Sequence, residues 1–379
     1  MVMATSAVGP GFLTQTAAFS ERYGLGMGLV IAISLLLDLV VVLNVWPVLV
    51  AAGRRAPALA NSVLPGFGIV LVFLVATGGL FFNIGNLGGA GLGLSALFGL
   101  APGWGAGLAA LIALVVLLWP GAGRAIDRTA QVAGAVLILL MLAAVVQLWP
   151  QLSWGRFPEL GSLVFPLVTI VGGTVGGYIP FSGAHRMLDL GFAGPDQLGT
   201  VRSAAVMGIL AGALVRVLLF LAAWAVVAGG TSLGDQNPAA AVFAVPFGLA
   251  GLRIFGLALF LAALTSVIGS AYTSVSFLTD LGPAWAKKSP WLVVGFIAIS
   301  LAVFLALGQP AKLLIVVGAL NALVLPFGLL VVLWAARRPD LLGGYRHPVW
   351  LWLLGLMALL LASLGGYFSF SGLASLWAE

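Results

Sequence analysis

The chain has 379 residues, of which 62% are hydrophobic and 7% are charged, and its mean hydropathy is +1.20. Soluble domains carry about 25% charged residues, so this composition cannot cover a water-facing surface and excludes an ordinary soluble domain. The sequence therefore predicts an all-α polytopic membrane protein.

The counts of reactive residues exclude several kinds of chemistry. Cysteine is absent, and the two histidines, His185 and His347, are far apart in the sequence. Disulfides, thiolate metal sites and cysteine nucleophiles are therefore excluded, and no HExxH or GxxxxGK[ST] motif occurs. We expect no cofactor and no enzymatic activity, and an ATP-driven pump is disfavoured.

The apolar runs predict about eleven membrane spans, because a helix needs about 20 residues to cross ~30 Å of hydrocarbon. Several runs exceed one span and must include a loop or a broken helix. In chain order the runs are 1–21, 26–52, 66–99, 104–120, 129–149, 161–190, 199–228, 240–280, 290–308, 312–336 and 348–374.

The basic residues support this count and predict an orientation. The net charge of +6 comes from residues scattered singly or in pairs, which favours a topology signal over nucleic-acid binding. With a cytoplasmic N-terminus and an outer C-terminus, eleven of the sixteen basic residues lie in cytoplasmic connections. They are Arg54, Arg55, Arg124, Arg128, Arg186, Arg202, Lys287, Lys288, Arg337, Arg338 and Arg346.

Two spans contain glycine and proline at matching places. Gly9-Pro10-Gly11 interrupts the first span, and the stretch 172–180 (GGTVGGYIP) interrupts the sixth, five spans later and in the opposite orientation. Interrupted helices at equivalent places of two halves indicate an inverted-repeat transporter with its site at the midplane. We expect one membrane domain over 1–379, with 1–150 as the first repeat, 161–336 as the second and 348–374 as an extra helix.

The sequence resembles the NRAMP family of proton-coupled divalent metal transporters, within the group that shares the LeuT-like fold. The resemblance covers nearly the whole chain. Three stretches carry it most firmly: 86–98 (NLGGAGLGLSALF), 264–270 (LTSVIGS), and 323–327 (LVLPF) leading to 337–341 (RRPDL).

The departures from the family concern its metal ligands and its proton route. Gly9 and Phe12 stand where the family's Asp-Pro-Gly-Asn motif supplies two ligands, and the stretch 176–181 lacks the Met and His of the sixth-span motif. Asn83 and Asn86 replace the third-span acids, and Val324 replaces a tenth-span Gln. Only eight residues precede Gly9, so we also expect the natural chain to begin further upstream.

The resemblance implies a substrate site between the two breaks. The side chains expected there are neutral, polar and aromatic, which favours a neutral polar solute or a weakly hydrated monovalent cation over a bare divalent ion, while backbone carbonyls and retained waters could still hold a largely hydrated magnesium ion. No residue of this sequence is assigned as a metal ligand. The expected residues are Gly9, Phe12, Thr14, Gln15, Asn83, Asn86, Gly176, Tyr178 and Ser182.

Several of these side chains have a second, structural interpretation. Thr14 and Gln15 either face the substrate or bond to the interrupted backbone. Asn83 and Asn86, three apart on one helix face, either bind substrate or tie helices together. Asp38 and Arg216 are the charges well inside apolar runs, so we expect them to pair, either as a gating or coupling pair or as a static bridge.

The sequence thus predicts a secondary transporter of the cell membrane that moves a small ion or solute by alternating access. Metal-ion transport is what the resemblance implies. Two alternatives stay open: an uncoupled, channel-like conductor, and a non-transporting sensor or scaffold. The expected partners are the substrate and the lipid bilayer.

Overall fold

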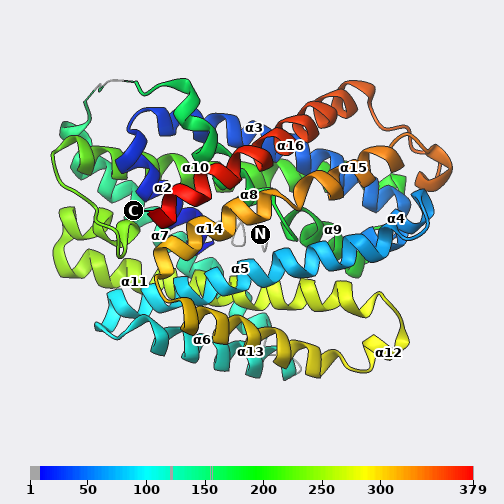
Figure 1. Ribbon diagram of the computed structural model, residues 1–379, viewed down its shortest axis with the longest axis horizontal. Helices are drawn as coiled ribbons and strands as arrows, with labels where there is room; N and C mark the ends of the chain where they lie inside the picture. The colour runs from blue at the N-terminus through cyan, green and yellow to red at the C-terminus, as the bar shows by residue number, and fades with distance from the viewer. Residues whose placement is uncertain (1–8, 120–122, 154, 156, 379) are drawn as a thin grey trace.

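The computed structural model describes residues 9–119, 123–153, 155 and 157–378, and these residues are helical with no strand (Figure 1). Nine helical segments are long and apolar enough to cross a membrane within this described part. α6 (Pro102–Leu118) and α2 (Pro10–Tyr23) fall below that length and occupy the two remaining expected spans. The predicted all-α membrane fold is confirmed.

The long helices follow the predicted apolar runs closely. They are α3 (Gly26–Ala52), α5 (Phe67–Phe98), α7 (Gly123–Leu148), α10 (Leu198–Ala228), α11 (Pro238–Thr279), α13 (Ser289–Leu307) and α16 (Val349–Ala378). Short helices α4 (Ala56–Val63) and α12 (Pro283–Ala286) and four 3-10 turns connect them: Trp149–Gln151, Leu160–Leu163, Pro195–Gln197 and Pro339–Leu342.

Proline and glycine set many helix limits. Pro10, Pro102 and Pro310 stand at the first turn of their helices, where the missing N–H has no intrahelical partner in any case. Gly53 and Gly99 end α3 and α5 in the left-handed region, with φ of 58° and 73°, which residues with a Cβ rarely adopt.

The sixth span is broken as predicted. It forms α8 (Val164–Val175) and α9 (Ile179–Asp189), separated by Gly176, Gly177 and Tyr178, and Gly177 has a φ of +58°. In the first span the structure describes the half that begins at Gly9, whose backbone is extended before α2. The residues before Gly9 lie outside the described ranges.

The tenth span is also broken, which the sequence did not predict. It forms α14 (Pro310–Ala322) and α15 (Leu325–Ala335) with Leu323 and Val324 between them. Pro326 explains the break, because its ring has no N–H to donate and would clash with the carbonyl one turn earlier. α11 bends at Gly248, two residues after Pro246, with a φ of 58°.

α5 and α11 lie side by side through the middle of the molecule, with α6 and α13 along one edge (Figure 1). Gly93 allows the two helices to approach closely, since a Cβ at this position would lie only 2.6 Å from the backbone nitrogen of Phe260. On the other side α3 packs on α10 and α8, and α10 also packs on α2.

The molecule has two ends with different connections. We call the end with α4, α12 and the connection between α15 and α16 the Arg55 end, at the right of Figure 1. We call the end with the last turn of α2 and the connection between α10 and α11 the Glu21 end. α3 runs from one end to the other and is about 40 Å long.

Candidate functional site

Asp38 and Arg216 form an ion pair at the centre, between α3 and α10. Arg216 Nη1 lies 2.6 Å from Asp38 Oδ2, and the two side chains are 2% and 0% exposed. Arg216 Nη1 also donates to Ser34 Oγ at 3.4 Å. The expected pairing is therefore present, and each buried charge is compensated by the other.

This ion pair also contacts α2 and α8. Thr174, in the last turn of α8, donates its hydroxyl to Asp38 Oδ1 at 2.8 Å. The Arg216 guanidinium carbon lies 5.2 Å from the ring centroid of Phe12 in the first turn of α2. The pair thus connects α3 and α10 with α2, which begins after Gly9, and with α8, which ends at the break of the sixth span.

Gln15 lies where α2, α8 and α14 meet. Its side chain is 1% exposed, and Nε2 donates to the carbonyl of Leu314 at 2.7 Å. Its Oε1 has no hydrogen-bond partner among the described residues. Thr14, the neighbouring residue, is also buried, and its hydroxyl lacks a partner within the same ranges.

Asn321 is a site residue that our sequence reasoning missed. It is fully buried in the last turn of α14. Its backbone carbonyl accepts the N–H of Gly177 at 3.2 Å, which joins the α8–α9 break to the α14–α15 break. Its Nδ2 donates to the carbonyl of Val317 at 3.0 Å. A buried amide in the apolar run 312–336 was the available signal. Thr174 was missed too, because its partner lies in a different span.

The other predicted side chains lie along α5, α9 and α11. Asn83 Oδ1 accepts the hydroxyl of Ser270 at 2.9 Å, and the amide nitrogens of Asn83 and Asn86 lack partners in the described part of the chain. Ser182 Oγ lies 3.0 Å from Thr273 Oγ1. The Tyr178 ring packs edge-on against Phe82, with the centroids 5.3 Å apart. Gly9 and Gly176 contribute backbone at the starts and ends of the half-helices.

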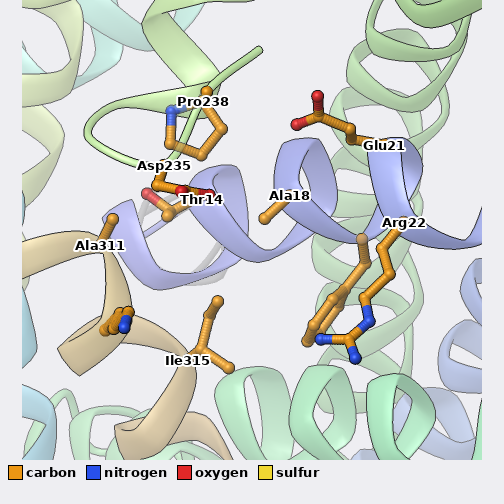
Figure 2. Close-up of a pocket in the computed structure, with 11 residues that line it drawn as sticks. Thr14, Ala18, Glu21, Arg22, Asp235, Pro238, Ala311 and Ile315 are labelled. Carbon is orange, nitrogen blue, oxygen red and sulfur yellow. The ribbon is translucent and has the colours of Figure 1, made fainter. Parts of the chain in front are cut away.

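A cavity of about 480 Å³ opens at the Glu21 end and extends to Thr14. Figure 2 shows Thr14 and Ala18 on α2 facing Ala311 and Ile315 on α14, with Asp235 and Pro238 above them. Glu21 lies at its rim, where its Oε1 accepts the Ser232 hydroxyl and the Leu233 N–H at 2.6 and 3.0 Å.

The Arg55 end is closed by a cluster of charged and hydrogen-bonded side chains. Arg55 lies 2.7 Å from Asp189 at the end of α9 and 3.1 Å from Asp280 just beyond α11. The Tyr272 hydroxyl donates to Asp189 at 3.2 Å. Beneath them, the N–H of Ala56 donates to His185 Nε2 at 3.0 Å. We call Arg55, Asp189, Asp280 and Tyr272 the Arg55 cluster.

The family model described as natural resistance-associated macrophage protein-like (Nramp) matches residues 1–371. The chain belongs to the Nramp family. Two bacterial relatives are similar to this Nramp chain over almost its full length. The uncharacterized membrane protein YcsG of Bacillus subtilis is 45% identical over 380 residues, covering 99% of this chain and 94% of the relative. An uncharacterized membrane protein of Haemophilus influenzae is 43% identical over 369 residues, covering 96% and 93%.

Solved structures show that this Nramp chain has the LeuT-like transporter fold. The Eremococcus coleocola manganese transporter aligns with a TM-score of 0.74 and 15% identity, over 98% of this chain and 85% of that one. MhsT in complex with L-phenylalanine aligns with a TM-score of 0.70 and 17% identity, over 96% and 97%. Within the described residues, no group of three or more His, Asp or Glu side chains is placed so that it could hold a metal ion.

Proposed function

We propose that this Nramp-family protein is a secondary transporter that carries a small ion or solute by alternating access. The observation that carries the proposal is the asymmetry of access to the polar centre. A cavity leads from the Glu21 end to Thr14, while the Arg55 cluster closes the opposite end. A transporter that works by alternating access never opens both ends to the site at once.

The arrangement of the helices supports two inverted repeats within 1–150 and 161–336, with α16 outside them. Helices that are equivalent in the two repeats make equivalent contacts: α3 packs on α9 while α10 packs on α2, and α5 packs on α13 while α11 packs on α6. In this proposal the Arg55 end is cytoplasmic, because it contains most of the basic connections.

Metal-ion transport is what membership of the family implies, but the site favours a substrate other than manganese or iron. The backbone at Gly9 and the ring of Phe12 offer no side-chain oxygen, and the α8–α9 break contains no methionine. Transition metals need softer or anionic ligands to replace their water. The proposed substrate is therefore a weakly hydrated monovalent cation or a neutral polar solute.

The Asp38–Arg216 pair is in this proposal a gating or coupling pair. It contacts Phe12 and Thr174, so a change in either charge reaches both broken spans. An uncoupled conductor is the second candidate, because Asn83 and Asn86 stand where the family has acids and cannot release a proton.

Uptake into proteoliposomes tests the proposed function. Purified protein is reconstituted, and the entry of Na⁺, Rb⁺, Mg²⁺ and Mn²⁺ is followed with and without an imposed pH or sodium gradient. Gradient-driven accumulation of a monovalent ion above equilibrium supports secondary transport. Equilibration without accumulation indicates a conductor. No entry of any ion, by protein that binds none of them, would exclude ion transport and leave a neutral solute or the scaffold alternative.

A further inference from the structure

Two buried amide side chains in the centre each keep an oxygen without a hydrogen bond. Gln15 Nε2 donates to the Leu314 carbonyl at 2.7 Å, and Asn321 Nδ2 donates to the Val317 carbonyl at 3.0 Å. Because a carbonyl oxygen can only accept a hydrogen bond, the amide atom that faces it must be the nitrogen. Gln15 Oε1 and Asn321 Oδ1 are then left without a donor among the described residues.

Glycines leave room for both oxygens. A Cβ at Gly173 would lie 2.9 Å from Gln15 Oε1, and a Cβ at Gly78 would lie 2.7 Å from Asn321 Oδ1. A Cβ at Gly177 would overlap the same Asn321 oxygen. Glycines of α8, of α5 and of the α8–α9 break therefore allow these amide oxygens to approach the backbone closely.

The surrounding backbone makes this place electronegative. α8 ends at Val175 and α14 ends at Ala322, and the Gly177–Asn321 backbone bond brings these two C-terminal ends together. Carbonyls in the last turn of a helix carry a partial negative charge of about half a unit. A buried acceptor without a donor destabilises the fold unless a ligand or water satisfies it.

We propose that a dehydrated monovalent cation, Na⁺ or K⁺, binds between Gln15 Oε1 and Asn321 Oδ1. Carbonyl oxygens at the ends of α8 and α14 complete its ligands. All of these oxygens are neutral, and neutral oxygens suit a monovalent ion better than a divalent one, whose sites usually include carboxylates. The role of the ion as cargo or coupling ion rests on the proposed transport function, whereas its binding does not.

Thermal unfolding of the purified full-length protein in detergent tests the proposal. NaCl or KCl replaces N-methyl-D-glucamine chloride at constant ionic strength, and MnCl₂ is a separate arm. We expect a saturable rise of the unfolding temperature with one of the two monovalent ions. Gln15→Leu and Asn321→Leu should each raise the half-saturating concentration at least tenfold.

Asn321→Asp keeps the size of the side chain and adds a negative charge. It should lower the half-saturating concentration at least tenfold, an effect that a merely destabilised protein would not show. Gln147→Leu is the matched control, because Gln147 donates the same kind of bond, to the carbonyl of Pro246, at an exposed place. It should leave the half-saturating concentration unchanged.

Three outcomes would overturn the proposal: no saturable rise in the natural protein, a rise that persists unchanged in Gln15→Leu and Asn321→Leu, or an equal rise with manganese. The third result would mean that the oxygens do not select a monovalent ion. Gradient-driven uptake without ion-dependent stabilisation would remove this ion site and leave the transport function standing. Ion-dependent stabilisation without uptake of any substrate would support the ion site and argue against the transport function.

Discussion

The Asp38–Arg216 pair is the residue-level feature on which most central contacts converge. Its two side chains were recognised from the sequence because each is a lone charge within an apolar run at similar depth. Thr174 and Phe12 could not be predicted as partners, because these contacts depend on where α8 and α2 lie beside the pair.

We predict that Asp38→Ala and Arg216→Ala each destabilise the protein more than the double change does. Each single change leaves one buried charge uncompensated, at a cost of about 3–5 kcal/mol, while removal of both is close to neutral. Unfolding in detergent by denaturant or heat measures the three variants. Strictly additive effects of the two substitutions would contradict the prediction.

Gly177→Ala should destabilise the α8–α9 break by about 1–3 kcal/mol. Its φ of +58° disfavours a Cβ, and that Cβ would overlap Asn321 Oδ1. Gly269→Ala is the control, since Gly269 lies in the helical interior of α11 with nothing within 4 Å of an added Cβ. It should be neutral or slightly stabilising, because alanine favours helix over glycine. Equal effects of the two changes would show that the break tolerates a Cβ.

At the scale of elements, apolar runs and punctuation by glycine and proline were enough to place the helices. The run predicted at 26–52 coincides with α3, Gly26–Ala52. The break between α14 and α15 was not predicted, because Leu323 and Val324 are apolar and its cause, Pro326, lies beyond them. The amide orientation of Gln15 could not be predicted either, because it depends on the Leu314 carbonyl of α14, which only the fold brings near Gln15.

A chain of hydrogen bonds attaches α16 and its preceding connection to α3 and α10. Arg202 donates to the Tyr345 hydroxyl at 2.7 Å, and that hydroxyl lies 3.2 Å from His347 Nδ1. His347 Nε2 lies 3.0 Å from Asn44 Oδ1. Because Asn44 donates its nitrogen to the Leu351 carbonyl, its oxygen accepts, so the neutral imidazole is protonated at Nε2.

This chain predicts a pH dependence of stability. Burial, with Arg202 as the smaller cause, lowers the pKa of His347 from 6.5 to about 4. A lowered histidine pKa means that the unfolded chain takes up a proton first, so stability is complete above about pH 6.5 and falls toward pH 4. Unfolding curves measured at pH 7 and pH 4.5 test this role. Between these two pH values, the free energy of unfolding of His347→Gln should fall by on the order of 1–2 kcal/mol less than that of the natural protein. Parallel losses in both proteins would rule out this role.

At the scale of the whole molecule, the fold is that of the Nramp family while the centre lacks that family's expected side-chain ligands. We predict that calorimetry finds no tight, saturable manganese site in the natural protein. Gly9→Asp should create measurable manganese binding, because Gly9 has an extended backbone with a φ of −70° that accepts aspartate. A tight site in the natural protein, unaffected by Gly9→Asp, would refute our account of the centre.

Alternating access is the central claim, and the absence of cysteine from the chain allows a direct measurement of it. Ala18→Cys reports on the cavity at the Glu21 end, and Ser182→Cys reports on the partly buried contact between α9 and α11 on the inner side of the Arg55 cluster. Each cysteine substitution is made in the natural protein and in Arg55→Ala. The rate at which a membrane-impermeant maleimide labels the cysteine is measured from each side of the proteoliposome membrane.

With Arg55 present, we expect fast labelling of Ala18→Cys from the Glu21 side and slow labelling of Ser182→Cys from the Arg55 side. Arg55→Ala removes the bonds to Asp189 and Asp280, so it should speed the second reaction and slow the first. Opposite changes at the two ends would support alternating access. Rates that Arg55→Ala leaves unchanged, or fast labelling at both ends at once, would contradict it.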